Sequence, residues 1–238
     1  RDRGICGSVA PLHLIGFLVF REPIIVLFEE LRTMTEAKPL TYKSLQGLSE
    51  KQIAEHHDVL YVGYVKKTDE IREKLKTVDL SKANATHSDL RELKLEEGFA
   101  VNGVRLHEGY FAALGGQGGK PTGNLLKMIE EDFGSYEKWE AEFKAMGLAA
   151  RGWVVLAYDW EDMKLHNYLC DAHNQGGVWG CSSMLILDVY EHAYFIDYGT
   201  KRKDYIEAFM KNLNWTYIEQ KANGMMMFEQ REKHAGKM

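Results

Sequence analysis

The 238-residue sequence has few cysteines and no excess of basic charge. Its three cysteines, Cys6, Cys170 and Cys181, form no C-x-x-C pair and leave one over in any disulfide scheme, which argues against a disulfide framework and a structural zinc site. Lysine and arginine number 30 against 35 aspartates and glutamates, so the net charge of −5 argues against nucleic acid as a main partner. We therefore expect a globular protein of a reducing compartment, the cytoplasm.

The first 33 residues lack a pattern that defines their role. Residues 4–20 carry no charge, but this stretch is short for a membrane span and lacks a clear A-x-A cleavage site. Three explanations stay open for residues 1–33: translated sequence upstream of a true start at Met34, a leader or anchor, and a folded extension. We treat them as an uncertain extension, expect no membrane partner for the protein, and assign no chemistry to them.

The next part of the chain has the periodicity of two long helices. Apolar residues recur at three-to-four-residue spacing over about 49–75, with Ser49 as the N-cap, and again over about 90–114. The short turn-rich linker between them predicts an antiparallel hairpin. The segment GGQGGKPTG (115–123) ends the second helix and lacks the spacing of a phosphate loop.

This glycine-rich segment marks a domain junction, with a helical hairpin domain at 34–115 and an α/β domain at 116–238. In the second domain, apolar or alternating runs bounded by turn residues predict strands, and between and around them lie helical patterns. The strands are expected at 152–159, 164–170 and 183–187, and the helices at about 124–132, 136–148 and 204–222.

Two histidines of the hairpin are candidates for a site. His56 lies on the inner part of the first helix, with Tyr64 about 80° further round it. His107 lies in the second helix one turn after Gly103, and because a glycine there costs about 1 kcal/mol relative to alanine, something is expected to come close. Taken singly, each histidine is also explained by a satisfied helix residue or by tight packing.

The stretch DVYEHAYF (188–195) adds a carboxylate and a third imidazole. It ends a buried strand on Asp188 and places His192 four residues later. Imidazole nitrogen with carboxylate oxygen suits iron, manganese or zinc, whereas calcium prefers more oxygens and structural zinc prefers thiolates. The candidate metal site therefore draws on both halves of the chain.

DVYEHAYF also resembles the D-x-[WFY]-E-H-[STA]-[FY]-[FY] signature of the iron/manganese superoxide dismutases. Seven further stretches between about Lys38 and Lys221 resemble this family in order and spacing: SEKQIAEHHDVLYVGYV, NGVRLHEGYF, GGKPTG, FGSYEKW, RGWVVL, YGTKRKDY and NLNW. Eight collinear matches are too many for chance, so the chain is identified by resemblance as a member of this family.

The resemblance implies an α+β fold, with an N-terminal antiparallel helical hairpin followed by a C-terminal α/β domain with a small three-stranded antiparallel sheet. It implies that His56, His107, Asp188 and His192 hold one iron or manganese ion per subunit. The implied activity is an oxidoreductase reaction, the disproportionation of superoxide to dioxygen and hydrogen peroxide. The residues do not decide between iron and manganese.

Further roles follow from the resemblance for residues around the ligands. Tyr64 and His173 are implied as a proton relay, with Gly103 leaving the room that His173 fills and Gln175 a less well placed competitor. Glu191 is implied to reach across a twofold interface to the partner subunit's His192, which requires a homodimer or homotetramer.

Arg202 resembles an arginine near the family's substrate funnel, where it would attract the superoxide anion. A solvated basic turn, formed with Lys201 and Lys203, is the competing interpretation.

The chain departs from the family at the expected interface. Leu60 and Phe195 stand where a histidine and a tyrosine usually hydrogen-bond across it. Losing one partner would strand a buried polar group at roughly 1–3 kcal/mol, but replacing both can be nearly neutral, so the paired change indicates a repacked interface. Phe111 and Tyr190 stand where tryptophans are common, while Trp153 is retained.

Two alternatives to the dismutase stay open. The first is a non-catalytic metal-binding member of the same fold, prompted by Leu60 and Phe195. The second is a zinc hydrolase with the same ligands, which lacks a supporting H-E-x-x-H motif.

Overall fold

The computed structural model describes residues 36–236. The expectations for residues 1–33, and for Cys6 among them, lie outside this range. Of the helices in the described range, none combines the length and the apolar composition needed to cross a membrane.

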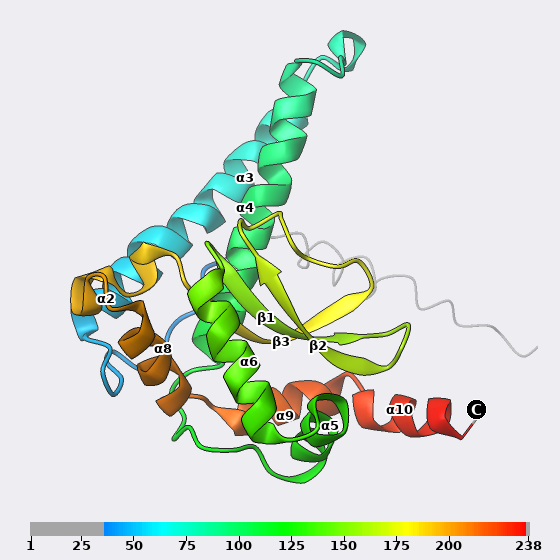
Figure 1. Cartoon of the computed structure of the whole chain (residues 1–238). Coiled ribbons are helices and arrows are strands. Elements are labelled where there is room, and N and C mark those ends of the chain that lie inside the picture. Colours follow the sequence, from blue (N-terminus) through cyan, green and yellow to red (C-terminus); the bar gives the residue numbers. More distant parts are fainter. Residues whose placement is uncertain (1–35, 237–238) are drawn as a thin grey trace, which may run out of the picture. The chain divides into compact units, whose positions relative to one another are not determined.

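The first half of the described chain is the expected helical hairpin. Its elements are α2 (Glu50–Ala54), the π-helical segment η1 (Glu55–Tyr61), α3 (Val62–Leu75), the short 3-10 helix η2 (Leu80–Lys82) and α4 (Asp89–Ala112). Ser49 caps α2 as predicted, since its hydroxyl accepts a hydrogen bond from the main-chain N–H of Gln52. The helices α3 and α4 pack along each other and extend well past the sheet (Figure 1).

The π-helical segment η1 was not predicted. It interrupts what the periodicity indicated as one continuous helix, and it carries His56. A π-helical turn adds a residue per turn without requiring a particular residue type, so the sequence pattern does not mark it.

The second half contains the predicted strands and more helices than expected. Its elements are α5 (Gly123–Phe133), α6 (Tyr136–Ala149), β1 (Trp153–Asp159), β2 (Lys164–Cys170), β3 (Cys181–Asp188), η3 (Glu191–Ala193), α7 (Phe195–Tyr198), α8 (Arg202–Lys211), α9 (Trp215–Gly224) and α10 (Met227–Ala235). The single helix predicted at 204–222 is wrong, because the chain breaks between α8 and α9. There the Asn214 side chain accepts the Tyr217 N–H and starts α9.

The three strands form the predicted antiparallel sheet, in the order β2-β1-β3. Neighbouring residues of a strand point to opposite faces, and β3 packs helices on both. Ile186 lies against Gly109 of α4, and Leu187 lies against Gly147 of α6. The sheet is thus covered on both faces, and its register pairs Trp153 with Asp188, the last residue of β3.

The glycine-rich segment after α4 is tied to the link between α8 and α9. The Gly116 and Gly118 N–H groups donate to the carbonyls of Asn212 and Leu213, each at 3.0 Å. These bonds join sequence regions from the two predicted domains. The domain boundary at 115/116 stays a prediction from the sequence.

Candidate metal centre

Four side chains from four segments converge beside the end of β3. His56 comes from η1, His107 from α4, Asp188 from the end of β3 and His192 from η3. One imidazole nitrogen or carboxylate oxygen of each lies within 4.8 Å of those of the other three. His192 is half-buried and the others are buried. The structure therefore brings together the four residues selected from the sequence.

Asp188 stands at the centre of this group. Its Oδ2 lies 3.0 Å from His56 Nε2, 3.1 Å from His192 Nε2 and 3.7 Å from His107 Nε2. One carboxylate oxygen thus faces all three imidazoles.

The rest of Asp188 is held by neighbours. Its Oδ1 accepts the main-chain N–H of Tyr190 at 2.9 Å, and its main-chain carbonyl accepts the hydroxyl of Tyr205 at 2.6 Å. The residue also pairs with Trp153 across the sheet. These contacts leave Oδ2 as the atom presented to the imidazoles.

His107 shows that the group fits a metal ion. Its Nδ1–H donates to the Gly103 carbonyl at 2.7 Å, so its Nε2 carries a lone pair. That Nε2 is the one buried side-chain nitrogen or oxygen within residues 36–236 without a hydrogen-bond partner. Leaving such an atom unsatisfied costs about 1–3 kcal/mol. Three imidazoles and one carboxylate form a donor set that suits iron or manganese, and an ion would satisfy this atom.

The electrostatics of the group favour a charged Asp188 carboxylate and neutral rings at His56 and His107, whereas at His192 burial lowers the pKa less than the nearby Asp188 charge raises it. Burial alone would raise the pKa of Asp188, but the attraction to His192 and the hydrogen bonds to His192 and His56 hold it well below its usual range. Burial lowers the pKa of His107 to about 3, and repulsion from His56 adds to this effect. Burial also lowers the pKa of His56. Both rings therefore keep a lone pair for a metal at neutral pH.

A second network joins Tyr64, His173 and Trp153 next to these residues. An indole N–H can only donate, so the Trp153 Nε1–H at 3.0 Å makes His173 Nδ1 an acceptor. The proton of His173 then lies on Nε2, which donates to the Tyr64 hydroxyl at 2.8 Å. Burial lowers the pKa of His173 to about 4, so the ring is neutral at pH 7. The Tyr64 hydroxyl accepts this bond and keeps its own proton free to donate.

The space beside Gly103 is filled differently from the prediction. A Cβ atom at Gly103 would lie 2.9 Å from Cδ1 of the Tyr64 ring, and the nearest atoms all belong to that ring. The interpretation that Gly103 makes room for His173 is therefore wrong in its detail, because the phenol ring takes the space and His173 bonds to its hydroxyl. Gln175 is exposed, and His173 makes the contact with Tyr64.

Aromatic rings pack around the four candidate ligands. The Phe111 ring lies 4.9 Å from that of His56, and the Trp153 ring lies 5.0 Å from that of His107. Tyr190 stacks on His192 at 5.2 Å with an interplanar angle of 15°. Although two of these positions depart from the family's usual tryptophan, all three rings shield the group from water.

Comparison with known proteins agrees with this geometry. Residues 121–221 match the family model described as the C-terminal domain of iron/manganese superoxide dismutases. The chain is 44% identical over 183 residues to "Superoxide dismutase [Fe]" of Aquifex aeolicus (strain VF5), which covers 75% of this chain and 86% of that protein. The chain belongs to the iron/manganese superoxide dismutases.

Other relatives in this family carry either metal in their names. "Superoxide dismutase [Fe]" of Cupriavidus metallidurans is 44% identical over 76% of this chain and 92% of its own length. "Superoxide dismutase [Mn]" of Haloarcula marismortui is 38% identical over 74% of this chain and 87% of its own length. The likeness therefore leaves the choice between iron and manganese open.

Two predicted site residues of this family member lie outside the buried group. The Glu191 side chain is exposed and makes no hydrogen bond within residues 36–236. Arg202 is half-buried at the start of α8, where its Nε donates to the Tyr194 hydroxyl at 3.1 Å and its NH1 donates to the Ala150 carbonyl at 2.9 Å. Their roles stay predictions.

The sequence analysis missed two supporting residues of this family member. Trp153 was noted only as a retained tryptophan, but its N–H fixes the proton of His173. Gln52 was not selected, although it is buried one helical turn before His56. A polar residue four positions before a candidate ligand, and so on the same helix face, is the signal that could have found it.

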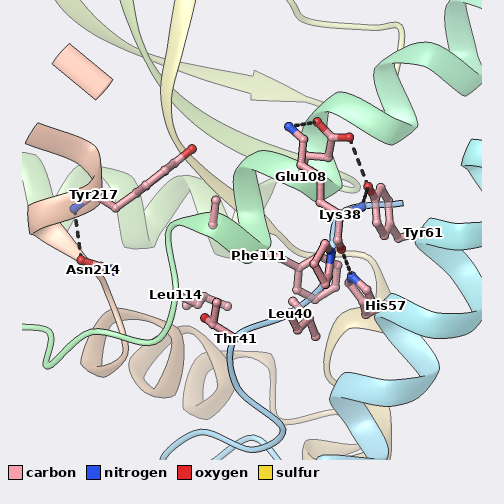
Figure 2. A pocket seen from close by; sticks show the side chains of 12 residues that line it. Lys38, Leu40, Thr41, His57, Tyr61, Glu108, Phe111, Leu114, Asn214 and Tyr217 are labelled. Carbon is pink, nitrogen blue, oxygen red and sulfur yellow. Dashed lines mark hydrogen bonds and ion pairs between the residues drawn. The ribbon is translucent and has the colours of Figure 1, made fainter. Parts of the chain in front are cut away.

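A cavity of about 310 Å³ adjoins the metal centre through Phe111. Figure 2 shows its polar wall, where the Lys38 main-chain N–H donates to the Tyr61 hydroxyl and that hydroxyl donates to Glu108. The Lys38 amino group pairs with the other Glu108 oxygen at 2.7 Å, and the Lys38 carbonyl bonds to His57 Nε2. None of the four candidate ligands lines this cavity, whose polar groups connect the start of the described chain to η1 and α4.

Proposed function

We propose that this superoxide dismutase holds its iron or manganese ion through His56, His107, Asp188 and His192. Two superoxide anions and two protons give one dioxygen and one hydrogen peroxide. The observation that carries the proposal is the convergence of the four side chains, with the buried His107 Nε2 lacking any other partner. One ion per subunit accounts for all four donors.

The bound ion supplies one-electron redox chemistry, alternating between the +3 and +2 states. The chain itself supplies the proton path. Burial raises the pKa of Tyr64, so its phenol is protonated at neutral pH. Tyr64 donates its hydroxyl proton to the reduced substrate, and solvent supplies the second proton that hydrogen peroxide requires. The hydrogen bond from His173 Nε2 stabilises the phenolate until solvent returns its proton.

A direct test uses the full chain. We would measure its bound metal by elemental analysis and its superoxide removal on the same sample. The expected result is about one iron or manganese per chain with activity, and loss of both in His192→Ala. The matched control is His166→Ala, because His166 is half-buried and lies outside the group of four, so this variant should behave as wild type. Redox metal without activity would indicate the binding protein, and zinc alone would indicate the hydrolase.

The proposed assembly is a homodimer in which Glu191 accepts a hydrogen bond from the partner subunit's His192. Support comes from the exposed Glu191 and from three exposed apolar side chains on the adjoining segments η1 and α7, namely Val59 (57%), Phe195 (48%) and Ile196 (47%). Burying these side chains would stabilise an interface. Light scattering should give twice the chain mass, or four times for a tetramer, and Phe195→Asp should shift it toward the monomer. A monomeric wild type would contradict the proposal.

Arg202 is proposed to attract superoxide through its positive charge, supported by the exposed Lys201 and Lys203 beside it. The competing structural role rests on its bonds to Tyr194 and Ala150. Lys201→Gln with Lys203→Gln leaves those bonds intact. If local charge guides the substrate, this double variant has a lower kcat/KM at low salt and approaches wild type at high salt.

The proposed compartment is the cytoplasm. Cys170 and Cys181 are both free thiols, as expected in a reducing environment. Fractionation of the source cells, followed by activity staining, tests this assignment.

A further inference from the structure

Gln52 is a buried polar residue that the chemistry above leaves without a role. Its side chain lies inside the protein, with only 1% of the residue exposed. Both ends of its amide are used: Nε2 donates to the His192 carbonyl at 2.7 Å, and Oε1 accepts the Ile196 N–H at 3.1 Å. The amide thus connects α2 with a segment about 140 residues later that carries a candidate ligand.

The two main-chain groups that Gln52 binds belong to the end turns of short helices. The His192 carbonyl belongs to the three-residue η3, and the Ile196 N–H belongs to the first turn of α7, which has no side-chain cap. Such end groups have no partner within their own helix. One amide therefore satisfies an orphan acceptor and an orphan donor, and so fixes the main chain on both sides of residues 193–195.

Gln52 is also close in sequence to His56, another candidate ligand. Gln52 lies in α2, four residues before His56 in the directly following π-helical segment η1. The rings of His56 and His192 have their centroids 5.0 Å apart. A single side chain thus links the helix of one candidate ligand with the main chain of the other.

We infer that Gln52 is a positioning residue that sets His192 against His56 and thereby retains the metal ion. This inference rests on the proposed function, since it assumes that both histidines bind the ion. The half-buried His192 is the least enclosed of the four, so its main chain is where an outside constraint has the most effect. Partners that orient metal ligands typically contribute 10–100-fold in metal affinity.

The test is the rate at which the metal-loaded enzyme loses its ion to excess EDTA, together with the rise in Tm that metal produces. Gln52→Met keeps the length of the side chain and removes both hydrogen bonds. We expect roughly tenfold faster metal loss and a smaller metal-dependent rise in Tm. An effect on folding alone would lower Tm with and without metal by similar amounts, and leave the rise unchanged.

Asn212→Leu is the matched control. Asn212 is another buried amide whose side chain binds the main chain of Gln46, 166 residues away, but it touches no candidate ligand. We expect this variant to lower Tm with and without metal alike, and to lose metal at the wild-type rate.

A second variant covers failure of Gln52→Met to fold. Gln52→Glu keeps an acceptor for Ile196 and, when ionised, removes the donor to His192, so it should also lose metal faster. Wild-type metal loss in a folded Gln52 variant would overturn the inference. His192→Ala distinguishes this outcome from failure of the proposed function. If His192→Ala retains the ion as wild type does, the ligand assignment is wrong. If His192→Ala loses the ion but the Gln52 variants retain it, only the positioning role of Gln52 is refuted.

Discussion

Two groups of side chains that could bind a metal ion lie at opposite ends of the sheet. One is the buried group at the Trp153–Asp188 pair, and the other is the hairpin group of Asp159, Asp162 and His166, where β1 turns into β2. In the hairpin group, Asp159 accepts the Glu161 N–H, Asp162 accepts the Lys164 N–H, and His166 bonds to Asp162. Each of these side chains therefore has a hydrogen-bond partner, either a main-chain N–H or another member of the group.

In the buried group, by contrast, the available hydrogen-bond partners do not satisfy every side chain. Three imidazoles face one carboxylate oxygen, and His107 Nε2 is left over where water does not reach it. The same residue types therefore indicate an ion only where burial removes the alternative partners. Burial and the orphan atom distinguish the groups better than composition does.

The largest expected effect is that of Asp188→Asn. This change removes the one anionic donor of the buried group while keeping its shape, so metal content and activity should fall by more than about 100-fold, beyond the usual loss for an outer partner. Asp162→Asn in the hairpin group should leave both unchanged. Elemental analysis and an activity assay check this, and an active Asp188→Asn variant would contradict the comparison.

Metal removal should have the next largest effect. If the free ion is present at 1,000 times its Kd, binding stabilises the fold by about 4 kcal/mol, and each kcal/mol shifts Tm by roughly 2–4 °C for a chain of this size. Removing the ion should therefore lower Tm by about 8–16 °C. Calorimetry checks this, with zinc or calcium added to the iron- or manganese-loaded enzyme as the control. A comparable further rise in Tm, lost in His166→Ala, would show that the hairpin group also binds a cation.

Trp153→Phe should have a moderate effect on activity. The variant removes the N–H that holds the proton of His173 on Nε2, and about a tenfold loss of kcat is expected. The matched control is Trp139→Phe, because Trp139 is equally buried and donates its N–H to Asn167, away from the metal centre. Equal losses of activity in both variants would mean that only packing had changed.

The smallest expected effect concerns the hairpin group in acid. Slight burial raises the pKa of Asp162, but the bonds from His166 and the Lys164 N–H outweigh it and lower the pKa overall. In this pH range folded Asp162 therefore binds fewer protons than unfolded Asp162. Its contribution to stability is complete above the unfolded pKa of about 3.9 and is lost as the pH falls through the lower pKa of the folded state. In metal-free protein, Asp162→Asn should remove less than about 1 kcal/mol of this pH dependence. Denaturant unfolding at several acid pH values measures it, and an unchanged dependence would contradict it.

The four converging residues could be selected from the sequence because the stretches that resemble the family contain them. Asp188 and His192 share one short stretch, and His56 and His107 follow recognisable helix patterns. The number of strands and their antiparallel pairing also agreed with what the family resemblance implied, whereas their order was not predicted.

The features that the sequence did not predict depend on the direction in which side chains point. Gln52 looks like one more polar residue among the charged positions of a helix, and only the packed structure shows that its face is turned inward. The indole of Trp153 and the ring of Tyr64 were assigned to the right neighbourhood, but which atom meets which depends on side-chain rotamers that no sequence spacing encodes. The break before α9 was missed because Asn212 and Asn214 act through side-chain bonds rather than through a change in hydrophobic period.

The separation of the candidate ligands along the chain also limits when the proposed site can form. His56 and Asp188 are 132 residues apart, so closing that loop is an entropic cost that must be met before the two can share a metal. A ribosome that has released only the hairpin exposes two histidines and no carboxylate from β3. Under the proposed assignment, the complete set of donors exists only after synthesis has passed His192.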